Sequence, residues 1–230
     1  NGWLSHWVPS KILCCSETAR RNHVALGYAD TKFTVIPNGF DIEKFAPDIG
    51  ARSALRGELG LDDDSILVGL VARFDPQKNH RGFIEAASKV LNKQSDVKFI
   101  MVGHGIDASN TALRDWTEKY GIASAVHLLG QRNDMPLVTA AFDVAVNSSL
   151  GEGFPNSVGE AMACGVPCVV TDVGDSADIV GPTGRVVAAG DSVGLGNQIL
   201  LLLALSHEER IQLGDAARRR VADRYEIGNV

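Results

Sequence analysis

Long apolar runs, internal repeats and extremes of composition are all missing from this 230-residue sequence. Its most apolar run, Ile199–Leu205, spans only seven residues, whereas a helix that crosses a bilayer needs about 20 apolar residues. No fixed period recurs along the chain, which excludes collagen and simple solenoids. Hydrophobic residues make up 45% of the sequence and charged residues 22%, which excludes the disordered class. We therefore expect a globular protein of one domain, or of one domain and part of another.

Positive charge is also scarce. Lys and Arg number 22 against 28 Asp and Glu, which gives a net charge of −6. Proteins that hold nucleic-acid phosphates usually carry a basic stripe, so we expect no nucleic-acid partner. The one basic run, Arg218–Arg220, lies in a helical pattern and is interpreted as a solvated helix face. A docking patch for an acidic membrane surface is the alternative.

Few residues are available for a metal site or a disulfide framework. The four cysteines, Cys14, Cys15, Cys164 and Cys168, show no zinc-ligand spacing with histidines. We interpret them as small buried hydrophobic residues in a reducing compartment. The acidic run Asp62–Asp64 stands in a short loop before a predicted strand and is interpreted as a polar turn. The sequence therefore predicts no metal site.

The N-terminal residues do not form a targeting signal. No basic head is followed by an apolar block, so no signal peptide is visible. The sequence also begins without Met, and we expect the chain to be part of a longer protein. The predicted location is the cytoplasm, with peripheral contact at the inner face of the membrane as an alternative.

Strand-like and helix-like segments alternate along most of the chain. Apolar, β-prone runs predict strands at Ile66–Ala72, Val97–Val102, Val126–Leu129, Asp143–Asn147 and Cys168–Thr171. Apolar residues at helical spacing predict helices at His80–Gln94, Thr111–Tyr120, Pro136–Ala141, Ser157–Ala163 and Asp191–Val221. This alternation predicts an α/β fold, a Rossmann-like parallel sheet with helices on both faces. Such folds bind ligands at the carboxyl ends of their strands.

The first forty residues form a block of their own. They are predicted to contain the strand Ile12–Cys15, the helix Glu17–Leu26 with Ser16 as its N-cap, and the strand Phe33–Ile36. A strong turn signal, Pro37–Gly39, follows. We interpret residues 1–40 as the last βαβ unit of a preceding domain with its linker. Residues 41–230 would be a second domain whose final helix is cut short.

Candidate ligand-binding residues follow two of the predicted strands. Arg73 and Lys78 stand at a strand-to-helix turn, where a planar guanidinium and a compact ammonium can clamp a diphosphate. Ordinary surface charge is the alternative. Gly103 and Gly105 allow a backbone to approach a ligand closely, although the full dinucleotide fingerprint needs a third glycine. His104 between them is interpreted as a loop residue and not as a catalytic base.

The segment from Ser148 to Pro167 is the most informative. Glu152 follows a predicted strand in a glycine-bearing loop, and Glu160 lies about one turn into the next helix. Loop amides and a helix N-terminus together form an anion site. Carboxylates on both sides of such a site are suited to hydroxyl groups, which sugars and ribose supply. Two solvated glutamates are the alternative interpretation.

These residues resemble a known family. The segment Glu152–Pro167 is similar to the signature of family 4 retaining glycosyltransferases of the GT-B fold. Further motifs occur in the family's order: its diphosphate motif at Val71–Asn79, its interdomain linker at Val35–Asp41, its nucleotide-pocket loops at Val102–Gly105 and Leu129–Gln131, and a matching stretch at Thr171–Asp175. The resemblance covers essentially the whole chain and implies the donor-binding, C-terminal half of a GT-B enzyme.

The resemblance also implies residue roles. Arg73 and Lys78 would bind the donor diphosphate, Glu152 would contact the donor sugar, and Glu160 would hold the ribose hydroxyls. Further donor contacts would come from the backbone at Gly153, Phe154, Asn156 and Ser157 and, around the base, from the loops at Gly103, His104, Gln131 and Arg132. No metal or other cofactor is implied, since the cations and a helix dipole would neutralise the leaving diphosphate. The nucleotide sugar is a substrate: a UDP-sugar is expected, and GDP- and ADP-sugars are the alternatives.

The implied reaction moves a sugar to an acceptor hydroxyl with retention at the anomeric carbon, in glycan or polysaccharide biosynthesis. The carbohydrate or lipid-linked acceptor would bind to a preceding lobe, so we expect this chain alone to bind a donor but hardly to transfer sugar. A nucleotide-sugar epimerase on the same scaffold and a non-catalytic nucleotide-binding module are the alternatives. A glycan phosphorylase would need a lysine-bound pyridoxal cofactor, which nothing in the sequence indicates.

Overall fold

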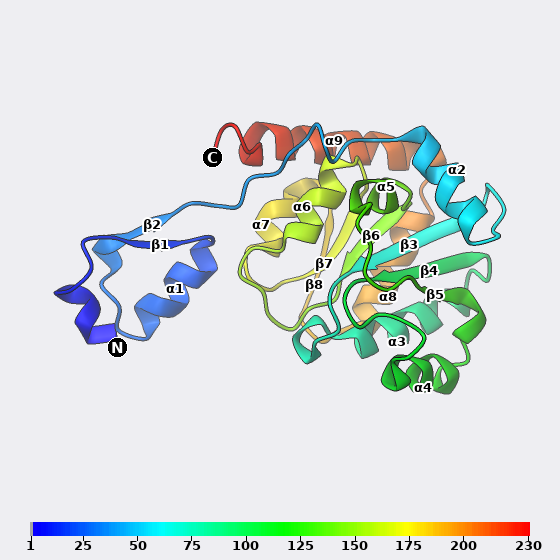
Figure 1. Cartoon of the computed structure of the whole chain (residues 1–230), viewed down its shortest axis with the longest axis horizontal. Helices are drawn as coiled ribbons and strands as arrows, with labels where there is room; N and C mark the ends of the chain where they lie inside the picture. The colour runs from blue at the N-terminus through cyan, green and yellow to red at the C-terminus, as the bar shows by residue number, and fades with distance from the viewer. Residues whose placement is uncertain (1) are drawn as a thin grey trace.

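A six-stranded parallel sheet forms the centre of the molecule (Figure 1). The structure is a computed structural model and describes residues 2–230. The strands run in the order β5-β4-β3-β6-β7-β8, with all neighbours parallel. Their bounds are β3 Ile66–Val71, β4 Val97–Val102, β5 Val126–Leu128, β6 Val144–Asn147, β7 Cys168–Thr171 and β8 Arg185–Val187. The predicted parallel α/β sheet is confirmed.

Helices cover both faces of this sheet, because its strands are apolar on both sides. One face packs against α2 (Ile49–Glu58), α5 (Met135–Ala140), α6 (Asn156–Ala163), α7 (Ser176–Val180) and α9 (His207–Tyr225). The other face packs against α3 (His80–Leu91), α4 (Thr111–Lys119) and α8 (Ser192–Leu203). Successive strand residues such as Leu67 and Val68 are buried in opposite cores, as the two-residue period of a strand requires.

The N-terminal residues form a small separate unit beside the sheet (Figure 1). The strands β1 (Ile12–Cys14) and β2 (Phe33–Val35) pair in parallel, with α1 (Glu17–Ala25) between them. Ser16 caps α1, because its side chain accepts a hydrogen bond from the Ala19 amide. A short 3-10 helix, η1 (Gly2–His6), precedes β1. This βαβ arrangement and its N-cap are those expected from the sequence.

The segment after β2 runs along the large domain and meets the end of α9. Phe40 pairs with Glu226 in an isolated parallel bridge, and its amide donates to the Tyr225 carbonyl at 2.7 Å. The Phe40 ring packs on α6, where a Cβ at Gly159 would lie 2.0 Å from a ring carbon. The chain's C-terminal residues are therefore paired with the linker, and Figure 1 shows the two running side by side.

The C-terminal tail differs from the sequence interpretation. The stretch Asp191–Val221 was predicted as helical without a break, and it consists of two helices, α8 and α9. Ser206 interrupts it because Ser206 and Glu209 form a capping box, in which each side chain bonds the other residue's backbone amide. Three further elements, α2, α7 and β8, were not predicted. In α2, Asp48 acts as the N-cap and accepts from the Ala51 amide.

The basic run Arg218–Arg220 is not simply the solvated helix face that we expected. Arg218 donates to the carbonyls of Phe45 and Ile42, both at 3.0 Å. Arg220 donates to the carbonyls of Asp178 and Ile179. Guanidinium groups with several donors can satisfy carbonyls that end short segments. These two arginines therefore tie α9 to the linker and to α7.

All four cysteines are free thiols. Cys164 and Cys168 are buried, and burial raises the pKa of each thiol to about 12. Cys14 and Cys15 are half-buried. The interpretation as buried hydrophobic residues holds for the second pair and only in part for the first.

Candidate functional site

Two predicted site residues from distant parts of the chain meet at the carboxyl edge of the sheet. The Lys78 Nζ lies 2.5 Å from the Glu152 Oε1. Lys78 belongs to the turn after β3, whereas Glu152 belongs to the loop after β6, and β3 and β6 are neighbours. Their side chains are only 19% and 10% exposed. The sequence placed both at strand ends, and the sheet order brings them into contact.

Glu152 has two further hydrogen-bond donors that the sequence analysis did not identify. The Ser149 hydroxyl donates to the Glu152 Oε1 at 2.7 Å, and the Asn147 Nδ2 donates to the same oxygen at 3.3 Å. Asn147 and Ser149 are 5% and 2% exposed. Their one signal in the sequence is their position, since polar residues that directly follow an apolar strand lie at the ligand-binding edge of such folds.

The loop that carries Lys78 is held firmly by its own turn and by the Glu152 loop. Asp75 caps a short 3-10 helix, η3 (Pro76–Lys78), and accepts from the Gln77 amide at 2.8 Å. The Ser148 hydroxyl donates to the Lys78 carbonyl at 2.9 Å, and the Leu150 amide donates to the Gln77 carbonyl at 2.7 Å. The ammonium and the carboxylate are thus presented by one connected pair of loops.

Arg73, the second predicted cation, stands apart from this contact. Its guanidinium pairs with the Asp75 carboxylate at 3.0 Å, and its side chain is 61% exposed. The Gln77 amide and, next, the Arg73 guanidinium lower the pKa of Asp75. Arg73 therefore lies on the same turn as Lys78, and its exposed guanidinium is bonded to Asp75 through Nε and Nη2.

The N-terminus of α6 follows Glu152 directly. Pro155 is the N-cap residue and supplies no side-chain cap, so the first amides of α6 are left for other acceptors. Phe154 is buried against the ring of Phe40, at a centroid distance of 6.0 Å. Asn156 is tied to the linker, because its Oδ1 accepts from the Asn38 Nδ2 at 2.7 Å. These contacts fix the loop backbone around Gly153 and the helix start.

Glu160 lies one turn into α6 and is half-buried. Burial raises the pKa of its carboxyl, and the nearby Lys44 opposes this effect. Within residues 2–230, no hydrogen bond is formed by either carboxylate oxygen of Glu160. A half-buried carboxylate without a partner is costly. Because both of its oxygens lack a protein donor, the Glu160 carboxylate can accept hydrogen bonds from a ligand.

The loops after β3, β4 and β5 lie next to one another and form the rest of this carboxyl edge of the sheet. The Phe74 amide donates to the His104 carbonyl at 2.8 Å, and the Gly103 amide donates to the Gly130 carbonyl at 2.8 Å. Gly103 has a φ of 148°, and a Cβ there would lie 2.1 Å from the Ala72 carbonyl oxygen. Only glycine permits this close approach. The predicted nucleotide-pocket loops at Gly103 and Gln131 are therefore adjacent.

Arg132 is already paired with two carboxylates. Its guanidinium donates to Asp134 at 2.7 and 2.8 Å and to the Glu58 Oε2 at 3.0 Å. These bonds raise the pKa of Arg132. Gln131 beside it is exposed. The protein's own carboxylates therefore occupy the Arg132 guanidinium, and Gln131 is the more accessible side chain of this loop.

The N-terminal unit is joined to the Glu152 loop by hydrogen bonds through Asp175. The Asp175 carboxylate accepts from the amides of Glu17 and Thr18 at 2.9 and 3.0 Å, at the first turn of α1. The Asp175 amide donates to the Gly153 carbonyl at 3.0 Å. Asp175 is thus placed between α1 and the residue that follows Glu152, which gives the matching stretch Thr171–Asp175 a structural role.

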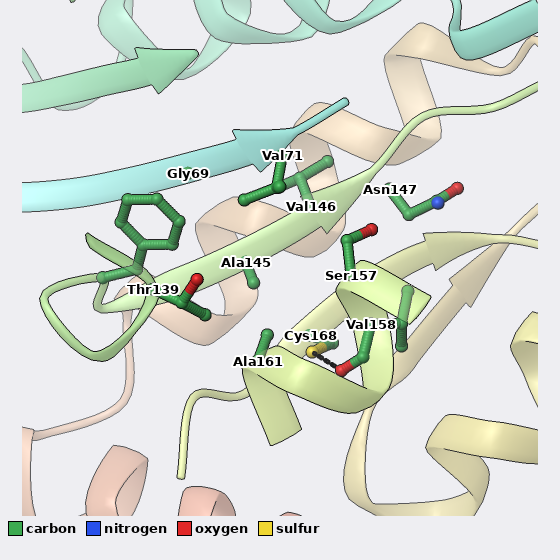
Figure 2. Close-up of a pocket in the computed structure, with 11 residues that line it drawn as sticks. Gly69, Val71, Thr139, Ala145, Val146, Asn147, Ser157, Val158, Ala161 and Cys168 are labelled. Carbon is green, nitrogen blue, oxygen red and sulfur yellow. Dashed lines mark hydrogen bonds between the residues drawn. The ribbon is translucent and has the colours of Figure 1, made fainter. Parts of the chain in front are cut away.

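A small cavity lies behind this edge, between β3, β6 and α6 (Figure 2). Gly69, Val71, Ala145, Val158 and Ala161 make it largely apolar. Figure 2 shows Asn147 and Ser157 toward one side of the cavity and Thr139 toward the other. Ser157, which the sequence predicts to contact the sugar donor, therefore also borders this cavity.

Residues 2–230 contain no group of three or more His, Cys, Asp or Glu side chains arranged to hold a metal ion.

The fold and this edge define an α/β domain in which a lysine–glutamate contact and an uncapped helix N-terminus lie together at the carboxyl edge of a parallel sheet. Residues 65–204 match the model of the family described as glycosyl transferases group 1. This match covers more than half of the chain. The chain therefore belongs to the glycosyl transferases group 1 family, and its fold is that of the C-terminal half of a GT-B glycosyltransferase.

Two bacterial enzymes illustrate the sequence similarity. The UDP-Gal:α-D-GlcNAc-diphosphoundecaprenol α-1,3-galactosyltransferase of Escherichia coli is 35% identical over 167 residues, which are 71% of this chain and 43% of that enzyme. The lipopolysaccharide core biosynthesis mannosyltransferase LpsB of Rhizobium meliloti is 32% identical over 171 residues, 71% of this chain and 48% of LpsB. The chain thus spans about half the length of these relatives.

Two crystal structures illustrate the structural similarity. Anabaena HepE in complex with UDP-glucose aligns with a TM-score of 0.90 and 25% identity, over 99% of this chain and 63% of HepE. The C-terminal domain of LpcC from Francisella tularensis aligns with a TM-score of 0.70 over 82% of this chain and 100% of that domain. At 21% identity, the second match supports the fold alone.

No helix within residues 2–230 has both the length and the apolar character needed to cross a membrane.

Proposed function

We propose that this chain is the donor-binding half of a retaining glycosyltransferase that uses a nucleoside-diphosphate sugar, with a UDP-sugar as the first candidate. The observation that carries the proposal is the meeting of Lys78 and Glu152 at 2.5 Å on the carboxyl edge of the sheet, beside the N-terminus of α6. The ligands in the names of two similar proteins support the choice of base: HepE was crystallised with UDP-glucose, and the Escherichia coli relative uses UDP-Gal.

Each part of the donor has a chemically suitable partner at this edge. The ammonium of Lys78 and the exposed guanidinium of Arg73 suit the diphosphate. The amides of the Gly153 loop and the first turn of α6 suit phosphate and sugar oxygens. Glu152 and the unpartnered carboxylate of Glu160 suit hydroxyl groups, which we assign to the sugar and the ribose. The base would lie along the loops at Gly103 and Gln131.

The proposed chemistry is substitution at the anomeric carbon. The bond between that carbon and the diphosphate oxygen breaks, and the acceptor hydroxyl forms the new bond on the same face. The leaving diphosphate takes up the acceptor's proton. Lys78, Arg73 and the helix N-terminus stabilise the charge that develops on the diphosphate. Under this proposal, transfer requires no metal or other cofactor.

The acceptor half of the reaction belongs to the proposal as well. We assign residues 1–40 to the end of an acceptor-binding lobe and residues 41–230 to the donor-binding domain. The acceptor would be a carbohydrate or a lipid-linked carbohydrate in glycan biosynthesis in the cytoplasm. Transfer needs both lobes around one cleft, so the chain alone should bind the donor without turnover.

Calorimetry on this chain with UDP, GDP, ADP and their common sugar conjugates tests the proposal. We expect one nucleotide to bind selectively, with the same affinity after EDTA treatment. The variant Glu118→Gln should bind like the wild-type chain and serves as a control, since Glu118 is exposed on α4, away from the site. Binding of none of these ligands, by this chain and by a longer form that includes the acceptor lobe, would contradict the donor-binding proposal.

A further inference from the structure

The two carboxylate oxygens of Glu152 have different surroundings. Oε1 accepts three hydrogen bonds, from the Lys78 Nζ at 2.5 Å, the Ser149 hydroxyl at 2.7 Å and the Asn147 Nδ2 at 3.3 Å. Among residues 2–230, no side chain or amide donates to Oε2. A carboxylate has about four acceptor positions in total. One oxygen is therefore saturated by the protein, while the other is left available.

The donors to Oε1 are themselves fixed by the sheet. The Asn147 Oδ1 accepts from the Ser149 amide at 3.2 Å. The Thr171 hydroxyl, at the end of β7, donates its one proton to the Ser149 carbonyl at 2.7 Å and lies 3.4 Å from the Asn147 Oδ1. Asn147, Ser149 and Thr171 are each 5% exposed or less. A buried polar network of this kind holds its members in one arrangement.

We propose that Ser149, assisted by Asn147, is a positioning residue that anchors Oε1 of Glu152 so that Oε2 faces a hydroxyl of the donor sugar. This inference rests on the proposed function and deepens it. Lys78 keeps one of its three N–H donors on Glu152, which leaves two for phosphate oxygens. The network thereby sets the spacing between the carboxylate for the sugar and the ammonium for the diphosphate, so that the site favours a diphosphate with a sugar attached.

The effect of Ser149 should therefore depend on whether the ligand contains a sugar. In Ser149→Ala, we expect the affinity for UDP-glucose or UDP-galactose, whichever the wild-type chain prefers, to fall by about tenfold or more. The affinity for UDP should stay within about twofold, because UDP has no group at the Glu152 Oε2. Ser149→Thr keeps the hydroxyl, and it should restore most of the sugar-dependent affinity.

Ser148→Ala is the matched control. Ser148 lies on the same loop and is buried, but its hydroxyl donates to the carbonyls of Lys78 and Asn79 and not to Glu152. Any change in this variant should affect UDP and the UDP-sugar equally. Calorimetry on the full chain with both ligands gives the ratio of the two dissociation constants, and thermal unfolding reports whether each variant is folded.

The outcomes separate this inference from the proposed function. If neither the wild-type chain nor a longer form that includes the acceptor lobe binds any nucleotide, the proposed function fails and the inference fails with it. If the wild-type chain binds and the ratio is unchanged in Ser149→Ala, only the inference is overturned. If Ser149→Ala does not fold, Asn147→Ala takes its place, because it removes another donor to Oε1. A smaller loss that is again confined to the UDP-sugar is expected there, and an unchanged ratio overturns the inference.

Discussion

Replacement of Glu160 by glutamine should stabilise the empty chain and weaken nucleotide binding. Glu160 is half-buried on α6, and burial raises the pKa of its carboxyl above the ordinary value of 4.5. The folded chain therefore holds this proton more tightly than the unfolded chain. Between the ordinary pKa and the raised one, the free energy of unfolding falls as the pH rises. Glutamine has the same shape and no charge, so the free energy of unfolding of Glu160→Gln should not show this fall with rising pH.

Nucleotide binding should change in the opposite direction. Hydrogen bonds to a charged acceptor contribute about 1.5–3 kcal/mol, against roughly 0.5–1.5 kcal/mol for neutral pairs. If ribose hydroxyls donate to the Glu160 carboxylate, the neutral amide should cost about 1–2 kcal/mol, or roughly 5- to 30-fold in the dissociation constant for UDP. Wild-type binding should weaken in the same way as the pH falls through the raised pKa of Glu160, while binding by Glu160→Gln should change less.

Two measurements check this pair of expectations. Urea unfolding at pH 5 and pH 7 gives the free energy of unfolding of wild type, Glu160→Gln and the exposed control Glu118→Gln. Calorimetry with UDP at the same pH values gives the affinities. Unchanged UDP affinity in Glu160→Gln would refute the ribose assignment. A lower stability of Glu160→Gln at pH 7 would refute the claim that the half-buried Glu160 carboxylate has no partner among residues 2–230.

Three further predictions concern charge. Replacing Arg73 and Lys78 together by alanine should weaken the binding of UDP much more than that of uridine, and calorimetry showing equal losses would argue against a diphosphate clamp. Arg56 is fully buried and donates to Asp143 at 2.7 Å; because Arg56→Ala leaves that carboxylate without its buried partner, urea unfolding should show a loss of about 3–5 kcal/mol. EDTA should leave UDP affinity unchanged in calorimetry, and a large loss would indicate a metal that the proposed mechanism lacks.

Much of the fold follows from local patterns in the sequence. The strands β4 and β7 have the predicted bounds, and most of the other predicted elements start or end within one or two residues of the observed positions. Buried parallel strands must be apolar on both faces, so their residues are recognisable without knowledge of their neighbours. The Ser16 cap is predictable because it depends on one side chain and the first turn of its own helix. The turn predicted at Pro37–Gly39 is not formed, since these residues lie in a segment without a turn between β2 and Phe40.

Interruptions and short polar elements were harder to predict. The tail Asp191–Val221 is helical as predicted, but the prediction did not include the capping box at Ser206, where a new helix starts. The strand β8 has only three residues and lies at the edge of the sheet. Helix α2 has no clear apolar face in its sequence, because its buried residues Ala51 and Leu55 stand beside the buried Arg56 while the apolar Ile49 is exposed. In each case, tertiary contacts outweigh weak local preference.

The candidate site shows the same division. Chain order and residue type alone placed Lys78, Glu152 and Glu160 at strand ends or on the following helix, because ligands of parallel sheets bind at that edge. Only the strand order β3-β6-β7 brings Lys78 to Glu152 and supports the Glu152 loop from the end of β7. Hydrogen bonds between residues some 70 positions apart leave no local pattern.

The sequence by itself therefore determined which residue types stand at the ends of which strands, since that depends on local hydrophobic period and turn chemistry. The tertiary structure decided which of these residues touch. Within residues 2–230, it gave three donors to one oxygen of Glu152, left the Glu160 carboxylate without a hydrogen-bond partner, and joined Asp175 to the first turn of α1. Such contacts depend on sheet order and loop packing, which arise from the whole chain and not from any single segment.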